Sequence, residues 1–174
     1  AQEFGNVTVF SITEEMDFMK PETKAGIRQH LEQNPGCSLH GSLPCTVWSQ
    51  WQMVLVRKRG PKYQKRLEER RKSAVQMLSD FVELGDLCIS LGGHVSFEWP
   101  RYCTGWLRSE LAEFIKRHDL CIADVDGCAC GLVNTKGKPL LKQWRFACLS
   151  QRLAYSLNHL RLSLIHISEP TRLG

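Results

Sequence analysis

The feature that most constrains the fold of this chain is the alternation of strand-like and helix-like segments along its 174 residues. Short apolar or β-branched runs predict strands, and the amphipathic runs between them predict helices. Strands are expected at 6–12, 37–45, 94–97, 119–126 and 143–150, and helices at 21–34, 62–91, 106–118 and 151–160. The segment 46–62 shows no clear period and is expected to be a loop or partly helical, and 134–139 is expected to be a polar turn. This order predicts an α/β domain with a mostly parallel sheet flanked by helices.

The positive charge of the chain is concentrated in one segment. The net charge is +5, and nine of the 23 Lys and Arg residues lie in 57–72, which holds only two acids. Such a segment favours an anionic partner, and we expect nucleic acid to be bound by its first half, through Arg57, Lys58, Arg59, Lys62 and Lys65. The run at 65–72 has a simpler explanation as a solvated helix face.

The sequence contains no sign of a membrane role. No apolar run approaches the roughly 20 residues that a spanning helix needs, and the N-terminus lacks a basic segment followed by an apolar stretch. We therefore expect an intracellular protein without membrane association.

Eight cysteines are spread along the chain, mostly inside apolar segments. Without an export signal, they are expected to be reduced and mostly buried. Cys128 and Cys130 could bind zinc together with a distant histidine, which is a minor alternative because there is no C-x-x-C pair.

Cys45 is the candidate nucleophile, because Pro44 fixes a turn at the end of a predicted strand and a basic segment follows. In open sheets of this class, sites form at the carboxyl ends of strands, where Cys45, Glu98 and the turn 126–131 are all expected. The alternatives are an inert buried thiol for Cys45 and a simple pairing with Arg101 for Glu98.

Three short motifs carry a resemblance. "PCTVWS" (44–49) resembles the Pro-Cys signature of the cytosine-5 DNA methyltransferases, "FEWP" (97–100) lies where that family has a Glu-Asn-Val motif, and "KQWRF" (142–146) lies where it has a Gln-x-Arg-x-Arg strand. The stretch from about Val7 to Arg161 is similar to a methyltransferase-like domain carried in retroelement polyproteins of microbial eukaryotes.

The resemblance implies roles for four residues. Cys45 would attack C6 of a flipped cytosine, Glu98 would contact the base at N3, Arg145 would orient the base, and Asp17 would lie near the adenosine of S-adenosylmethionine. It also implies a partial Rossmann-like methyltransferase fold without its first βαβ portion, because no glycine-rich cofactor loop precedes the first strand.

Several positions depart from the family pattern. Leu43 replaces a proline, Trp99 and Pro100 replace Asn and Val, and Ala147 replaces the second arginine. A non-catalytic nucleic-acid-binding module of a mobile element therefore remains an alternative, as does a thiol hydrolase that pairs Cys45 with His40 or His94.

Residues 162–174 resemble a translated sequencing adaptor rather than natural protein. We therefore expect one methyltransferase-like domain over 1–161, truncated at both ends, and a non-natural tail.

Overall fold

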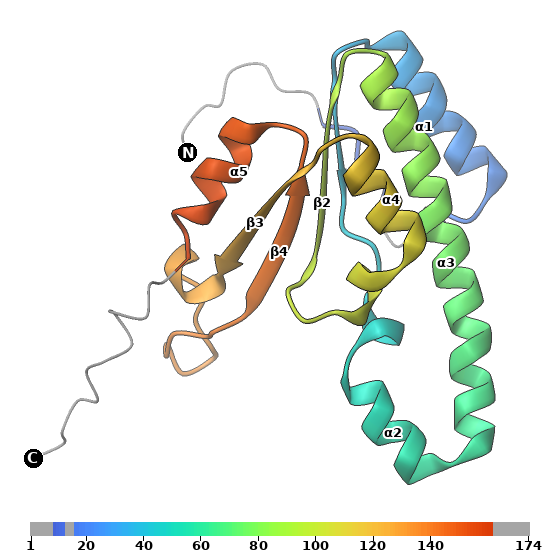
Figure 1. Cartoon of the computed structure of the whole chain (residues 1–174), viewed down its shortest axis with the longest axis vertical. Coiled ribbons are helices and arrows are strands. Elements are labelled where there is room, and N and C mark those ends of the chain that lie inside the picture. The colour runs from blue at the N-terminus through green and yellow to red at the C-terminus, as the bar shows by residue number, and fades with distance from the viewer. Residues whose placement is uncertain (1–8, 13–15, 162–174) are drawn as a thin grey trace, which may run out of the picture.

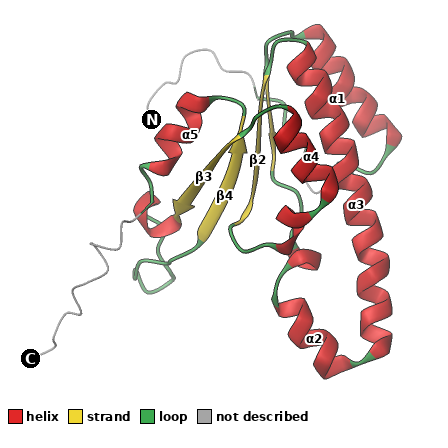
Figure 2. Ribbon diagram, in the orientation of Figure 1, coloured by secondary structure: helices red, strands yellow, loops and turns green. Residues whose placement is uncertain are grey.

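The computed structural model describes residues 9–12 and 16–161, and it has an α/β architecture built on one open four-stranded sheet. The strands are β1 (Ser38–Gly41), β2 (His94–Pro100), β3 (Cys121–Asp126) and β4 (Gln143–Cys148). They lie in the order β1-β2-β4-β3 (Figure 2).

The sheet is mixed, so the expectation of a mostly parallel sheet is wrong. Only β1 and β2 pair in parallel, whereas β4 runs antiparallel to both of its neighbours. The physical reason is the connection between β3 and β4. Parallel neighbours need a long crossover, usually a helix, but this connection contains only the short 3-10 helix η3 (Gly127–Cys130) and a polar turn in which Asn134 accepts two backbone hydrogen bonds.

Helices cover the two faces of the sheet unequally. α1 (Pro21–Gln33), α3 (Pro61–Ser90) and α4 (Ser109–Arg117) gather on one face, and α5 (Gln151–Asn158) lies on the other, against β3 and β4 (Figure 1). The expected helices are confirmed within a few residues at each end. The face opposite α3 is therefore covered only along half of the sheet.

The segment after β1 is more helical than the sequence indicated. It forms the 3-10 helix η1 (Thr46–Trp48) and then α2 (Trp51–Arg59), which packs on α3 in a helical hairpin. Gly60 separates the two helices with a φ of +73°, a conformation that favours glycine, and Pro61 starts α3 at the first helical position. Figure 1 shows α2 and the first half of α3 extending beyond the sheet.

The main core lies between α3 and β2. Leu78, Phe81 and Cys88 of α3 are buried on the face that the helical spacing predicted, and they pack in one cluster with Phe97 and Trp99 of β2. Large buried aromatic side chains supply much of the apolar area that holds such a layer together.

The strand expected at 6–12 is not observed in the part that can be examined. Residues 9–12 form no strand, Val9 and Phe10 are exposed, and 6–8 lie outside the described residues, as do 162–174. Among the residues that the structure describes, no helix is both long enough and apolar enough to span a bilayer.

Candidate functional site

The parallel register of β1 and β2 decides where the candidate site lies. Gly41, the last residue of β1, is the partner of Phe97 in β2. The chain that leaves β1 therefore emerges at the end of the sheet where Glu98 follows Phe97. β1 is shorter than predicted, so Cys45 lies four residues beyond the strand and immediately before η1.

The loop that leads to Cys45 is anchored to β2 by Trp99. This indole is 1% exposed, and its Nε1–H donates a hydrogen bond of 2.6 Å to the carbonyl oxygen of Leu43. The Cys45 carbonyl in turn accepts from the Trp48 backbone N–H at 2.9 Å. The half-buried Cys45 is thus held from both sides, although Trp99 occupies a position where the methyltransferase pattern has Asn.

Glu98 faces an open hollow of about 430 Å³ on the side of the sheet that carries α5. His40, Lys142, Trp144 and Phe146 line the hollow with it. Burial raises the pKa of Glu98 above its usual value, although a hydrogen bond from Ser42 Oγ at 3.4 Å and the charge of Lys142 act in the opposite direction. The environment therefore favours the protonated carboxyl more than water does.

Cys45 does not line that hollow, but it is close enough to Glu98 for the two groups to interact electrostatically. Burial raises the pKa of Cys45, its own backbone N–H lowers it, the Glu98 carboxylate raises it and Lys142 lowers it. Nearby Cys103 is buried, and burial raises its pKa to about 11, so it stays a thiol. Cys45 and Glu98 thus form a coupled pair next to one cation.

Arg145 is not part of this pair. Glu98 is opposite Phe146 in the β2–β4 register and Arg145 is opposite the buried Trp99, so Arg145 lies on the other face of the sheet. Its Nε and Nη2 donate to the carboxylate of Asp124 at 2.8 and 3.2 Å. Arg101 joins the same carboxylate at 3.2 Å, so the alternative pairing of Glu98 with Arg101 is not observed.

Asp17 also lies away from the hollow. Its carboxylate accepts the Met19 backbone N–H at 2.9 Å, in an exposed turn before α1, and it is not among the residues that line the hollow beside Glu98. Neither this turn nor that hollow offers a glycine-rich loop between a strand and a helix. The described residues therefore do not fit S-adenosylmethionine.

The residues expected to bind nucleic acid are all exposed. Arg57, Lys58 and Arg59 end α2, and Lys62 and Lys65 begin α3. Trp51, which starts α2, is 73% exposed, so an aromatic ring suited to stacking lies on the same hairpin. The hairpin follows Cys45 and η1 in the chain.

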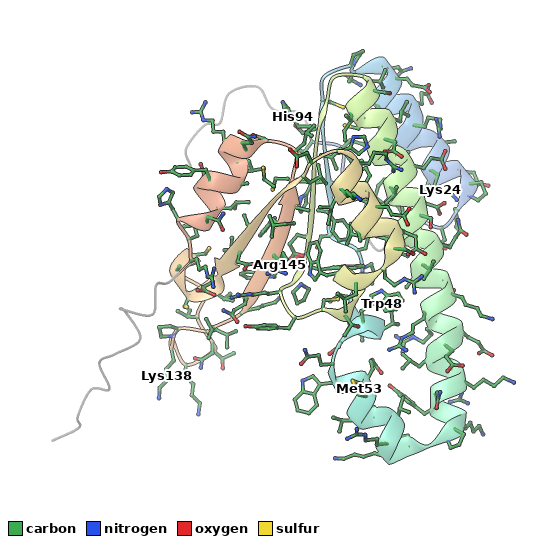
Figure 3. The ribbon with its side chains drawn as sticks, viewed as in Figure 1. Lys24, Trp48, Met53, His94, Lys138 and Arg145 are labelled. Atoms are coloured by element: carbon green, nitrogen blue, oxygen red, sulfur yellow. The ribbon has the colours of Figure 1, made fainter. Side chains whose placement is uncertain are left out.

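The histidines proposed as partners of Cys45 lie apart from each other. His94 begins β2, at the end opposite Glu98, and Figure 3 shows it far from Trp48. His40 lines the hollow, but its Nδ1 contacts Ser96 Oγ at 2.8 Å, and burial lowers its pKa. Among the residues that the structure describes, the hydrogen bond of His40 goes to a hydroxyl and not to an acid, so the Cys–His–acid arrangement of a thiol hydrolase is not observed there.

The eight cysteines are free thiols, as expected, but only Cys88, Cys103 and Cys148 are buried. Within 9–12 and 16–161 there is no cluster of three or more His, Cys, Asp or Glu side chains suited to a metal ion.

Two residues of the site were missed by the sequence reasoning. Lys142 and Ser42 supply the cation and the hydroxyl beside Glu98. A signal for Lys142 existed: in an extended strand, positions 142, 144 and 146 share a face, and Arg145 cannot share it.

Comparison with models of protein families, with curated proteins and with solved structures finds no match to this chain. The basis for assigning a function is therefore the geometry of the residues described above.

Proposed function

We propose that this chain is part of a cytosine-5 DNA methyltransferase-like domain in which Cys45 and Glu98 act on a pyrimidine base. The observation that carries the proposal is their position at the same end of two parallel neighbouring strands, close enough for the charge of Glu98 to raise the pKa of Cys45. Both side chains come from motifs that occur in this order in the resembling family.

The chemistry assigned to the pair is a covalent addition. The Cys45 thiolate forms a bond from Sγ to C6 of the base, and the C5–C6 double bond of the ring is lost. The electron pair displaced onto the ring is neutralised when N3 takes the proton of the protonated Glu98 carboxyl, which becomes a carboxylate. Because burial raises the pKa of Glu98, the site favours the protonated form that this step requires.

The strand directions in the sheet also support the proposal. In the order β1-β2-β4-β3, β1 and β2 are parallel, β4 is antiparallel to both of its neighbours, and the edge strand β3 therefore runs in the same direction as β1 and β2. This is the arrangement expected for the second half of a Rossmann-like methyltransferase sheet. The basic helical hairpin that follows Cys45 suits the phosphates on either side of an extruded base.

In such a domain, methyl transfer needs S-adenosylmethionine. The described residues do not fit this cofactor, so no step here is derived through it, and the test must not depend on it.

A DNA duplex pool with 2-pyrimidinone in place of cytosine provides that test, because addition at C6 of this base needs no methyl group. We expect a covalent protein–DNA band on a denaturing gel with the wild-type chain and with Cys128→Ser, which removes another partly exposed thiol. The band should be absent with Cys45→Ser. An adduct that survives Cys45→Ser, or no adduct with any variant, would contradict the catalytic proposal.

A second candidate is a nucleic-acid-binding module without catalysis. It is favoured because burial raises the pKa of Cys45, so the thiolate is disfavoured, whereas the basic residues of the hairpin are exposed. Replacing Arg57, Lys58 and Arg59 with Ala should lower the slope of log affinity against log salt by about 2–3, since each lost duplex phosphate contact removes about 0.9. Matched replacement of the exposed Lys136 and Lys138 with Ala should leave the slope unchanged.

A further inference from the structure

A second open hollow, of about 480 Å³, lies between η1, α3 and the start of α4 and is separate from the hollow beside Glu98. Trp48 is its aromatic wall, with two guanidinium groups near its ring. Arg71 lies 5.5 Å from the ring centroid and Arg108 lies 5.7 Å from it. Figure 3 shows Trp48 beside the hairpin of α2 and α3.

The indole N–H of Trp48 has no acceptor among the described residues. Trp48 is 5% exposed, and its Nε1 is a buried donor without a hydrogen-bond partner. Unpaired buried donors are uncommon in folded proteins and require an explanation, because leaving one unpaired costs about 1–3 kcal/mol. Solvent does not reach this nitrogen in the structure, so a ligand in the hollow would supply the missing acceptor only after a small shift of the Trp48 ring.

The charge around the hollow favours an anion. Arg71, Lys72 and Arg108 line it, against one acid, Glu68. Arg71 donates to the Val47 carbonyl through Nε at 3.2 Å, which fixes the guanidinium and leaves its terminal nitrogens without a hydrogen bond to any residue that the structure describes.

Arg108 is paired with a carboxylate, since it donates to Glu110 through Nε and Nη2. Glu68 keeps its negative charge, because it accepts from the neutral amide of Gln64 at 2.9 Å. Arg71 and Lys72 outweigh that one charge and leave the hollow net positive.

We infer that this hollow binds a phosphate group. A phosphate presents several acceptor oxygens and matches a planar guanidinium that is already held in place. Arg71 and Lys72 would donate to it, and a further oxygen would accept from the Trp48 indole. This inference does not depend on Cys45 chemistry. It rests on the proposed nucleic-acid binding only for the source of the phosphate, which would be a backbone phosphodiester or a free phosphate ion.

Indole N–H signals provide a direct test. The chain carries five tryptophans, and a sample labelled with ¹⁵N-tryptophan gives one signal for each, with that of Trp48 assigned by its loss in Trp48→Phe. We expect this signal to move downfield on addition of a short DNA oligonucleotide or of inorganic phosphate, with ionic strength held constant by KCl. Arg71→Gln and Lys72→Gln should each weaken the response at least fivefold, whereas Lys136→Gln on the remote turn should not change it.

The two ligands separate the sources. A shift with the oligonucleotide at concentrations at least tenfold below those needed for inorganic phosphate indicates a backbone phosphate, and equal concentrations indicate the free ion. A Trp48 signal that moves with neither ligand, or that moves equally with chloride, overturns the inference. Cys45→Ser should respond like the wild type, so failure of the catalytic proposal leaves this result unchanged.

Discussion

Trp99 holds the loop that carries Cys45, so removing its N–H should both destabilise the protein and loosen that loop. Trp99→Phe deletes the 2.6 Å bond to the Leu43 carbonyl, and an unpaired acceptor costs about 1–3 kcal/mol. The ring also becomes smaller by about 40 Å³, which adds about 1 kcal/mol at about 24 cal/mol per Å³ of cavity. We expect the free energy of unfolding to fall by about 2–4 kcal/mol.

Trp106→Phe is the matched control. Trp106 belongs to the same aromatic cluster, and its Nε1 donates to the Pro100 carbonyl at 3.1 Å, so this variant also loses an indole bond but leaves Leu43 bonded. Urea denaturation measures the stability of both variants. Iodoacetamide labelling, mapped to the Cys45 peptide by mass spectrometry, measures opening of the loop.

The labelling rate of Cys45 should rise roughly 5- to 150-fold in Trp99→Phe, which corresponds to about 1–3 kcal/mol lost from the loop anchor. In Trp106→Phe it should rise much less. Equal rates in the two variants, or a Cys45 rate in Trp99→Phe that matches the wild type, would refute the role of Trp99 as anchor of the loop.

Three further substitutions follow from the same structure. Gly105→Ala places a Cβ well inside van der Waals contact with a ring carbon of Trp99, so it should lower the free energy of unfolding by about 1–3 kcal/mol in urea denaturation. Asp124→Asn weakens two arginine contacts and should cost about 1.5–3 kcal/mol at pH 7. Burial acts to raise the pKa of Asp124, but Arg145 and Arg101 hold that pKa below its usual value. The stability that these contacts supply is therefore present above about pH 4 and should be lost as the pH falls further. Comparing denaturation of the wild type and Asp124→Asn at pH 7 and at pH 3 would show this loss. Glu98→Gln leaves the burial of Cys45 but removes a carboxylate that raises its pKa, so the pH midpoint of Cys45 labelling should move downward.

The helices were predictable because their local signals agree with their packing. In α3, for example, Pro61 marks the start, and Leu78, Phe81 and Cys88 recur on one buried face. Strand direction was harder to predict, because it depends on the length and content of the connections. The polar turn around Asn134 was recognised in the sequence, but its consequence, an antiparallel β4 between β2 and β3, was not drawn.

The sequence predicted which end of the sheet the candidate site occupies, but it did not predict which face of the sheet each side chain lies on. The approach of Cys45 to Glu98 follows from two parallel neighbours that run toward the same end of the sheet, with the last residue of β1 opposite Phe97. Arg145 was placed with them by motif order alone, but side chains alternate along β4, and the residue opposite Glu98 is Phe146. No local sequence feature indicates that Trp99 anchors the loop, because the Leu43 carbonyl to which it donates lies 56 residues away in the chain.

The protonation states of the proposed pair place a limit on its activity. Burial raises the pKa of both Glu98 and Cys45, so the same environment favours the Glu98 proton that the addition requires and disfavours the Cys45 thiolate that it also requires. The reactive form carries a protonated Glu98 and a Cys45 thiolate. At any pH between the pKa of Glu98 and the pKa of Cys45, the fraction of the protein in this form is constant, and it depends only on the difference between these two pKa values. Lys142 lowers the pKa of both groups, whereas the backbone N–H of Cys45 lowers only the pKa of the thiol. The loop geometry that holds this N–H near the sulfur therefore favours the combination of a protonated Glu98 and a Cys45 thiolate that the addition requires.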